Sequence, residues 1–395
     1  MNRKRITSFF AASMLYWAAQ YIYVPTLPAY VKTTVASLTA VGVVLSMYGL
    51  WSAILRIPTG IAVDATGRTK ASIVGGFLLA AVGALVMGRG GSAGALIFGR
   101  ALTGASTATW VPVMVVFAGF FPPEKTVFAT SLLAISTSLG QVIATGSTGF
   151  LNQLGGYPLA FFVGAGLAVA ATVIIASVRI PRTDSALPRA VSPRSIMRIF
   201  TRPDVLLPSF ASAVCQFGVW AVVFAFLPLL ARELGAGGVL VSLLMTTNLV
   251  ANTAANLFST LGVRKANRRH ILFGSFAVFA AGAILAAVAR SVPLLFAATA
   301  LMGIANGVFY PVLLGLSIEL VDFPHRTTAM GIHQAVYALG MFAGPWIGGI
   351  LADALGIRAM FAIIAGFCTA VASLLVVLNA RRKVSSDTGR GAAQA

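Results

Sequence analysis

Long apolar runs follow one another through almost the whole of this 395-residue chain, separated by short breaks rich in charge, proline or glycine. Each run is about as long as the ~20 residues that a helix needs to cross the hydrocarbon layer of a membrane. In lipid only helices and closed barrels satisfy their backbone hydrogen bonds, and runs of this length favour helices. The sequence therefore predicts an all-α integral membrane protein with twelve transmembrane helices. With 58% apolar and 9% charged residues, no soluble catalytic domain fits in the remainder.

The breaks between the runs also predict the domain organisation. Residues 181–204 form the longest polar stretch and carry five basic residues beside prolines and serines. We expect a six-helix bundle over 1–180, a cytoplasmic linker over 181–204, a second six-helix bundle over 205–383 and a disordered tail over 384–395. The expected spans lie near residues 6–30, 38–63, 71–88, 93–121, 127–151, 158–180, 205–231, 238–262, 271–289, 293–319, 327–351 and 357–379.

Basic residues are unevenly distributed between the two sides of these spans. If the N-terminus is cytoplasmic, the inner segments hold 21 of the 28 Lys and Arg, the outer segments hold five, and Arg56 and Arg100 lie within spans. Because cytoplasmic loops attract positive charge, this bias predicts that both termini are cytoplasmic and that the chain is a multi-pass protein of the cell (inner, cytoplasmic) membrane. It also accounts for the net charge of +19 without a nucleic-acid partner.

The two halves of the chain resemble each other when the sequence is shifted by about 200 residues. The matching positions include Leu27-Pro28 with Leu227-Pro228, Leu139-Gly140 with Leu339-Gly340, and Gly149 with Gly349. Such a repeat predicts two parallel, pseudo-symmetric bundles with a substrate site near the middle of the bilayer between them. The interiors of the third, sixth, ninth and twelfth spans lack strongly polar side chains, so we expect these helices to be outer supports.

Polar side chains at helical spacing gather on single faces of four other spans, and we expect these faces to line the substrate cavity. They are Tyr16, Gln20 and Tyr23 on the first span, Gln216 and Trp220 on the seventh, Asn248, Asn252 and Asn256 on the eighth, and His333 and Tyr337 on the eleventh. The three asparagines are either cavity residues or a polar seam between helices.

Arg100 lies about two turns inside the fourth span, where an arginine needs a backbone carbonyl, a substrate anion or a titrating group as partner. No Asp or Glu lies in the central part of any span. Cys215 and Cys368 lie inside apolar runs, so neither a disulfide framework, a metal site nor a cofactor is expected.

Two motifs carry a family resemblance. Arg56, Pro58, Gly60, Asp64, Gly67 and Arg68 stand as RxPxGxxxDxxGR between the second and third spans, and Leu96, Arg100 and Gly104 stand as LxxxRxxxG in the fourth. Over its whole length the sequence resembles the major facilitator superfamily, in particular its twelve-span drug/proton-antiporter branch. It departs from the family pattern at Ala65, where a basic residue is usual, and at Thr103, where glutamine is usual.

The family's antiporter motif, GxxxxxxxxGxxxGPxxGG, belongs in the fifth span of its exporters. Here the complete pattern stands in the eleventh span instead, with Gly344 and Pro345 at its centre. This displacement weakens the inference of export. In either transport direction, such a run favours a closely packed and bendable helix at the interface between the halves.

Asp64 ends the second span on the cytoplasmic side, where the eleventh span begins. A carboxylate beside a helix N-terminus gains about 0.3–1 kcal/mol. We therefore expect Asp64 to act as a gate latch that favours the outward-open state, and the alternative is an ordinary loop carboxylate paired with Arg68.

The resemblance implies a secondary active transporter that works by alternating access on small organic molecules, as a proton-coupled exporter. Family exporters of lipophilic cations usually carry a carboxylate in the first or another early helix, and this chain lacks it, so the resemblance favours neutral, zwitterionic or anionic substrates over cationic ones. Its partners would be the substrate, protons and the lipid bilayer, and its functional unit a monomer. Import of a sugar or organic acid by the same fold, or a receptor without transport, are the alternatives. An enzyme is not expected, because no HExxH motif is present and His333 has no catalytic companion. The candidates for proton coupling are His333, Asp64, Glu319 and Asp353, and an uncoupled carrier stays open.

Overall fold

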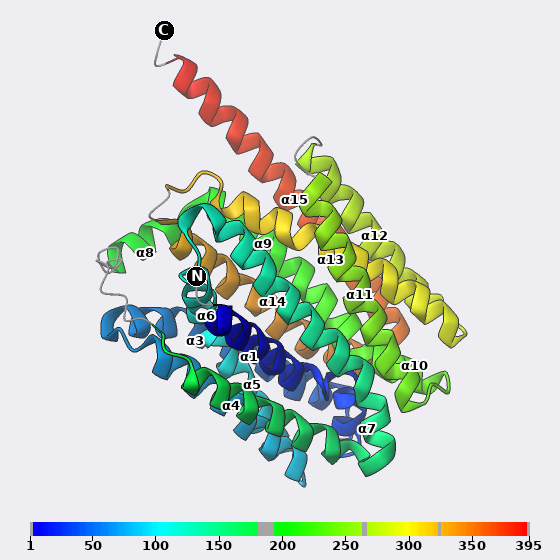
Figure 1. The fold of residues 1–395 in the computed structure, drawn as a ribbon. Coiled ribbons are helices and arrows are strands. Elements are labelled where there is room, and N and C mark those ends of the chain that lie inside the picture. Colours follow the sequence, from blue (N-terminus) through cyan, green and yellow to red (C-terminus); the bar gives the residue numbers. More distant parts are fainter. Residues whose placement is uncertain (1–2, 181–192, 263–266, 323–324, 393–395) are drawn as a thin grey trace.

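The computed structural model describes residues 3–180, 193–262, 267–322 and 325–392, and every regular element in these ranges is a helix (Figure 1). This confirms the prediction of an all-α protein. The elements of the first half are α1 (Arg3–Tyr21), η1 (Val24–Thr26), α2 (Leu27–Lys32), α3 (Leu38–Thr66), α4 (Thr69–Arg89), α5 (Ala93–Ser106), η2 (Thr107–Thr109), α6 (Trp110–Ala118), η3 (Pro123–Lys125) and α7 (Thr126–Ser177). Those of the second half are α8 (Pro193–Phe200), α9 (Pro203–Val219), η4 (Trp220–Phe226), α10 (Leu227–Glu233), α11 (Gly238–Gly262), α12 (Arg268–Val288), α13 (Val292–Ile318), α14 (Arg326–Leu355) and α15 (Ile357–Ala392).

Ten helices in the described ranges are long and apolar enough to cross a membrane, compared with the twelve spans expected. The difference arises at two places. The expected first span is interrupted between Tyr21 and Val24, where proline follows and the chain continues as η1 and α2. The expected fifth and sixth spans run together in α7, which is kinked at Gly155 and Gly156; Gly156 has φ of 69°, a conformation that suits glycine. The twelve-span count and the orientation of the termini therefore stay predictions.

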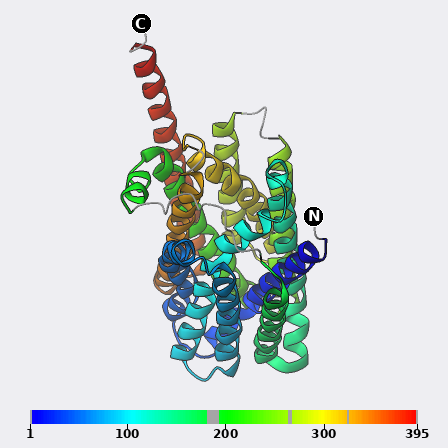
Figure 2. The same ribbon diagram turned by 60° about the vertical axis from the view of Figure 1, so that its left-hand side comes forward.

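The repeat seen in the sequence reappears as equivalent helix contacts in the two halves. A Cβ atom added at Gly140 of α7 would overlap the carbonyl oxygen of Met14 in α1. At the position 200 residues later, a Cβ atom on Gly340 of α14 would overlap the carbonyl oxygen of Ala213 in α9. Both halves thus use glycine to bring the same pair of helices into backbone contact. Figures 1 and 2 show the resulting two bundles beside each other, one toward the blue and one toward the red end of the colour scale.

The two bundles meet along two helix pairs, α3 with α14 and α7 with α11. In the first pair, a Cβ atom on Gly42 would overlap the carbonyl oxygen of Pro345, and one on Gly349 would lie 2.6 Å from that of Leu38. In the second pair, a Cβ atom on Gly149 would lie 2.6 Å from the carbonyl oxygen of Gly238. These contacts lie near the end of the molecule that the charge distribution predicts to be extracellular, which we call the outer end.

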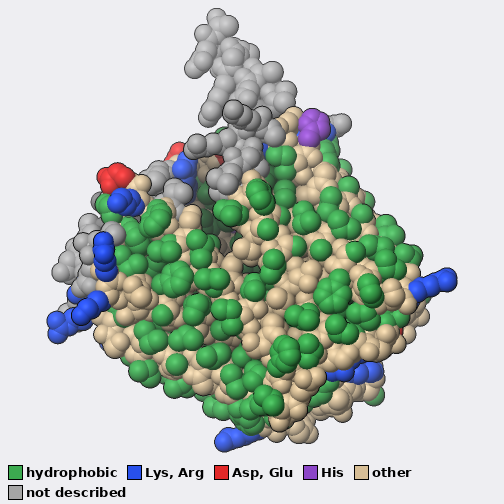
Figure 3. Space-filling model, turned by 45° about the vertical axis from the view of Figure 1, so that its right-hand side comes forward, with side chains coloured by type: hydrophobic (Ala, Val, Ile, Leu, Met, Phe, Trp, Pro, Cys, Tyr) green, Lys and Arg blue, Asp and Glu red, His purple; other side chains and the backbone are tan. Residues whose placement is uncertain are grey.

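The helices expected to be outer supports carry large apolar side chains on their exposed faces. Examples are Leu78 and Val82 of α4 and Ile284 and Val288 of α12, each at least 44% exposed. On the face drawn in Figure 3, hydrophobic side chains are spread over the middle and Lys and Arg lie at the margins. A surface of this kind is what contact with lipid requires.

Two segments outside the bundles differ from the sequence prediction. Helix α8 lies within the stretch 181–204 that we expected to be a linker, and residues 181–192 are outside the described part. Helix α15 continues to Ala392, through most of the expected disordered tail 384–395, and projects from the bundle in Figure 1. The physical reason is that a helix already formed adds further residues at little cost.

The orientation can be tested by cysteine labelling. Thr201, in the segment predicted to be cytoplasmic, and Gly237, at the outer end, are both exposed, whereas the native Cys215 and Cys368 are buried and give little background. In intact cells, an impermeant maleimide should label Gly237→Cys and not Thr201→Cys, and disruption of the membrane should expose Thr201→Cys. Labelling of both variants in intact cells would contradict the predicted orientation.

Candidate functional site

A small pocket with an empty volume of about 220 Å³ lies where the two halves meet. Residues of both halves line it: Val24, Leu27, Leu45 and Arg100 from the first, and Trp220, Phe224, Ala225 and Pro345 from the second. The break in the first expected span contributes Val24 and Leu27, so that the interruption of that helix lies at the pocket wall. Interrupted helices at a junction between repeats are a common setting for substrate sites in transporters.

Arg100 of α5 is the charged residue of this pocket. Its side chain is 2% exposed, and its guanidinium carbon lies 4.3 Å from the centre of the Tyr48 ring. Its Nε and Nη1 atoms are buried and have no hydrogen-bond partner. The ion pairs found in the described residues do not include Arg100. A buried guanidinium in this situation is short of both hydrogen-bond acceptors and negative charge.

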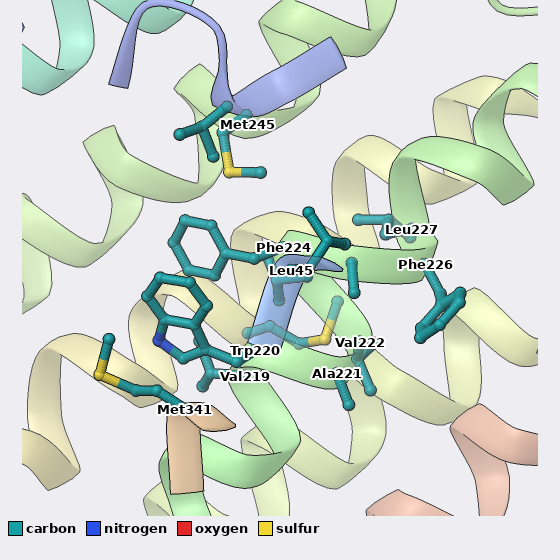
Figure 4. Packing of buried hydrophobic residues seen from close by; sticks show 14 of the residues in the cluster. Leu45, Val219, Trp220, Ala221, Val222, Phe224, Phe226, Leu227, Met245 and Met341 are labelled. Atoms are coloured by element: carbon teal, nitrogen blue, oxygen red, sulfur yellow. The ribbon is translucent and has the colours of Figure 1, made fainter. Parts of the chain in front are cut away.

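Three aromatic rings form a row beside Arg100. The ring of Tyr48 in α3 stacks on that of Trp220 at 5.2 Å, and Trp220 stacks on Phe224 at 4.8 Å. Figure 4 shows the last two rings next to each other, with Leu45 and Met245 nearby. Trp220 and Phe224 belong to η4, a π-helical turn, and such turns often occur at functional sites. The sequence predicts Trp220 as a cavity residue because it lies on a polar helix face, whereas it gives no such indication for Tyr48 or Phe224.

The side chains of the first span that the sequence predicts to line the cavity connect α1 to α5, next to Arg100. Gln20 donates hydrogen bonds through Nε2 to Ser106 Oγ at 2.6 Å and to the carbonyl oxygen of Thr103 at 3.1 Å. Tyr16 and Tyr23 interact with the same glutamine, at 3.1 and 3.5 Å. All three predicted side chains are buried, and they hold the wall of the first half in place.

The polar side chains predicted on the seventh and eighth spans lie mainly in seams of the second half. Gln216 donates to Asn306 Oδ1 at 3.4 Å, and Asn248 donates to the carbonyl oxygen of Thr299 at 2.8 Å. The carbonyl oxygen of Asn252 faces Gly307 of α13. The side chain of Asn248 thus lies in the polar seam with α13, and for Asn252 and Asn256 both alternatives stay open. A role of these residues in substrate binding stays a prediction.

Polar contacts also cross from one half to the other between α3 and α14. Arg56 donates through Nη1 to Gln334 Oε1 at 2.6 Å and to the hydroxyl of Tyr337 at 3.3 Å. One helical turn away, His333 is fully buried, with Nδ1 3.1 Å from Ser209 Oγ and with Nε2 lacking a partner. His333 and Tyr337 thus lie together, as the sequence predicts for one helix face, and Arg56 contacts Tyr337 from the other half.

At the outer end the two halves are joined by a carboxylate at a helix start. Asp353 of α14 accepts hydrogen bonds from the backbone N–H of Leu38 at 2.8 Å and of Thr39 at 2.7 Å, and from the Thr39 hydroxyl at 2.6 Å. These are the first residues of α3, whose N–H groups have no partner within the helix. Asp353 therefore acts across the interface in the way that a capping residue acts within one helix.

Comparison with known families decides the identity of this architecture. The family model of the Major Facilitator Superfamily matches residues 9–230 and, a second time, residues 209–394. The chain belongs to the major facilitator superfamily. Each of the two matches covers one of the bundles described above, which agrees with the internal repeat.

The chain is also similar to curated transporters and to solved structures of other proteins. It is 30% identical over 111 residues to a probable sugar efflux transporter of Mannheimia succiniciproducens, and 32% identical over 109 residues to the inner membrane transport protein YajR of Escherichia coli. Each match covers 28% of this chain, and the chain spans 28% and 24% of those relatives. Its fold is similar to that of a bacterial homologue of the human lysosomal transporter Spinster, solved in an inward-facing, unoccupied conformation, with a TM-score of 0.78, 15% identity and coverage of 96% of this chain and 98% of the other.

The remaining motif residues of the superfamily lie at the inner end of α3 and in the middle of α14. Gly67 ends α3 with φ of 64°, and a Cβ atom on Gly60 would meet no neighbour. Arg68 is exposed. The side chain of Asp64 is outside the described part, so its predicted role as a latch stays a prediction.

The glycine run of α14 contacts both halves of the protein. A Cβ atom on Gly344 would overlap the carbonyl oxygen of Phe217 in α9, whereas Pro345 faces Gly42 of the first half. Glu319, one of the coupling candidates, accepts a hydrogen bond from Arg268 at 2.9 Å and so pairs within the second half.

The contacts of Asp353 predict a shift in the balance between open and closed outer ends. Asp353→Asn removes the negative charge at the start of α3, an interaction worth about 1 kcal/mol for an exposed group. We expect the outward-open population to rise about fivefold. The rate at which an impermeant maleimide labels Leu45→Cys from outside should rise by the same factor. Glu233→Gln, which is also exposed at the outer end, is the control. An unchanged labelling rate would show that Asp353 does not hold the outer end closed.

Proposed function

We propose that this protein is a secondary active transporter of small organic solutes that works by alternating access as a proton-coupled exporter. The observation that carries the proposal is a pocket lined equally by two repeated bundles, with direct contacts between those bundles on its outer side. A solute in such a pocket can be released to either side if the bundles rock about it. The proposed location is the cytoplasmic membrane, and the proposed functional unit is a monomer.

The distribution of contacts supports an inward-facing state. From Leu38 to Arg56, α3 is joined to α14 by glycine contacts and by the hydrogen bonds of Asp353 and Arg56. Beyond Arg56, α3 is more exposed, with Ile61 at 50%. The face in Figure 3 is also hollowed in its upper part. An alternating-access cycle requires these outer contacts to break when contacts form at the inner end.

Export is supported by the relative described as a sugar efflux transporter, and import of a nutrient is the alternative outcome of the test. Purified protein in liposomes should exchange a radiolabelled substrate across the membrane, and an imposed pH gradient should drive net movement against the concentration gradient. Outward movement in exchange for protons supports export. Absence of exchange for every compound of a broad panel would favour a receptor without transport.

His333 provides the test of proton coupling. Its Nε2 atom is buried without a partner while Nδ1 faces Ser209, so the ring has a nitrogen able to take up a proton beside the interface between the halves. His333→Gln should keep exchange in the absence of a gradient and lose the acceleration by a pH gradient, which we expect to be at least tenfold in the native protein. His270→Gln, an exposed histidine of α12, is the control. A full response to the gradient in His333→Gln would eliminate this residue as the coupling site.

A further inference from the structure

The pocket contains a positive charge that the protein itself leaves uncompensated. Arg100 is 2% exposed, two of its nitrogen atoms are buried without partners, and its contacts with the Tyr48 ring and the Tyr23 hydroxyl supply no negative charge. Arg56 is also buried and its Nε also lacks a partner, but both of its terminal nitrogens donate hydrogen bonds, Nη1 to Gln334 and Nη2 to Ser52. The difference between the two arginines indicates that Arg100 is short of a partner that comes from outside the chain.

We propose that this partner is the carboxylate of a small organic anion and that Trp220 and Phe224, with Tyr48 packed behind Trp220, bind the flat apolar body of the same molecule. The inference rests on the proposed transport function and narrows its substrate class. A carboxylate supplies both negative charge and several acceptor lone pairs, which is what the free donors of Arg100 require.

The remainder of the pocket fixes the other properties of the ligand. Besides Arg100, its lining is apolar or aromatic: Val24, Leu27, Leu45, Trp220, Phe224, Ala225 and Pro345. Such a surface offers stacking and burial and few hydrogen bonds, so a sugar-like body with many hydroxyl groups would leave them without partners. One or two rings with a single carboxylate match this chemistry.

The position of the row adds a link to the transport cycle. Tyr48 belongs to the first half, and Trp220 and Phe224 belong to the second, so the row crosses the interface. Arg100 lies in the first half. A ligand that bonds to Arg100 and stacks on Trp220 and Phe224 contacts both halves at once, and only such a ligand can bias their relative positions through differential contacts.

The test measures binding of 2-naphthoate to the full-length protein in lipid nanodiscs by equilibrium dialysis. The comparison ligands are 2-naphthamide, which has the same rings without the charge, and acetate, which has the charge without the rings. We expect naphthoate to bind about 10- to 100-fold more tightly than the amide, as charged hydrogen bonds allow, and acetate to bind at least 100-fold more weakly than naphthoate.

Substitutions then assign each part of the ligand to its site. Arg100→Gln should lower the affinity for naphthoate to within threefold of the affinity for the amide. Binding of the amide should stay unchanged, which also shows that the variant is folded. Phe224→Leu should weaken naphthoate and amide by the same factor, about five- to tenfold. Arg358→Gln, at the outer end of α15, removes a different arginine and should change neither affinity.

Equal affinity for naphthoate and amide in the native protein, or an undiminished preference in Arg100→Gln, would overturn the inference. If Arg100→Gln does not fold, the affinities of naphthoate and amide for the native protein and for Phe224→Leu still test the inference. Exchange in liposomes separates this outcome from that of the proposed function. Transport of neutral compounds without a preference for naphthoate refutes the anion site and leaves the transporter. Arg100-dependent binding without exchange of any compound supports the site and refutes transport.

Discussion

Replacing Gly42 by valine is expected to lower transport at least a hundredfold while the protein stays folded. Even a Cβ atom at this position of α3 would overlap the carbonyl oxygen of Pro345 in α14. Overpacking costs about 1–3 kcal/mol where neighbours can move, and here the neighbour is a backbone atom, so the upper end of that range applies. Because α3 and α14 belong to different halves, the clash affects the state with a closed outer end and leaves each bundle intact.

Gly75→Val is the matched control for this variant, because a Cβ atom at Gly75 of α4 would meet no atom within 4 Å. In liposomes, exchange should be lost in Gly42→Val and kept in Gly75→Val. An impermeant maleimide should label Leu45→Cys from outside faster in the Gly42→Val background. Transport near the native rate would mean that α3 and α14 do not approach each other in the cycle as they do in this structure.

Loss of Arg56 is expected to change the ratio of the inward-facing to the outward-facing population by about 10- to 150-fold. Arg56 is 6% exposed, and its hydrogen bond to Gln334 joins the two halves at 2.6 Å. Hydrogen bonds of charged groups contribute about 1.5–3 kcal/mol, and this one exists only while α3 and α14 are in contact at this level. Arg56→Met should therefore reduce the inward-facing population and lower transport to a similar degree.

A double-mutant cycle separates this contact from other effects of the substitution. Gln334→Met leaves the guanidinium without its shortest bond, so it should be at least as harmful as Arg56→Met. The double variant should be less impaired than the sum of the two predicts. Spin labels on the outer ends of α3 and α14 would give the two populations directly from their distance distribution. Arg89→Met, on the exposed surface of α4, is the control, and additive effects of Arg56→Met and Gln334→Met would refute the coupling.

The sequence predicted most of the fold because membrane helices are specified by local composition. Hydropathy located nearly every helix, and α11 begins and ends at the expected residues 238 and 262. The repeat of about 200 residues predicted the two bundles because equivalent glycines, such as Gly140 and Gly340, are needed for equivalent backbone contacts. The interruption after Tyr21 was not predicted, since the residues around it are as apolar as the rest of the span.

The site was less accessible to sequence reasoning because it is built from pairs of distant residues. Arg100 stood out as a charge within a span, and the structure adds that two of its nitrogen atoms are buried without a hydrogen-bond partner. Phe224 gave no signal, because a phenylalanine in a membrane helix usually faces lipid or a neighbouring helix. Asp353 was considered only for proton coupling, since nothing in its local sequence indicates that it meets the first turn of α3.

The break between Tyr21 and Val24 has a consequence for how the specificity of this protein can be mapped. Where the helix is interrupted, peptide groups lose the regular i to i−4 bonding that occupies the main chain elsewhere in the membrane. Val24 and Leu27 bring this segment to the pocket wall. The main chain thus shapes the pocket wall here, and its path stays in place in an alanine scan of the pocket. Part of the substrate specificity then depends on the conformation of the main chain. That part changes only with substitutions that alter this conformation.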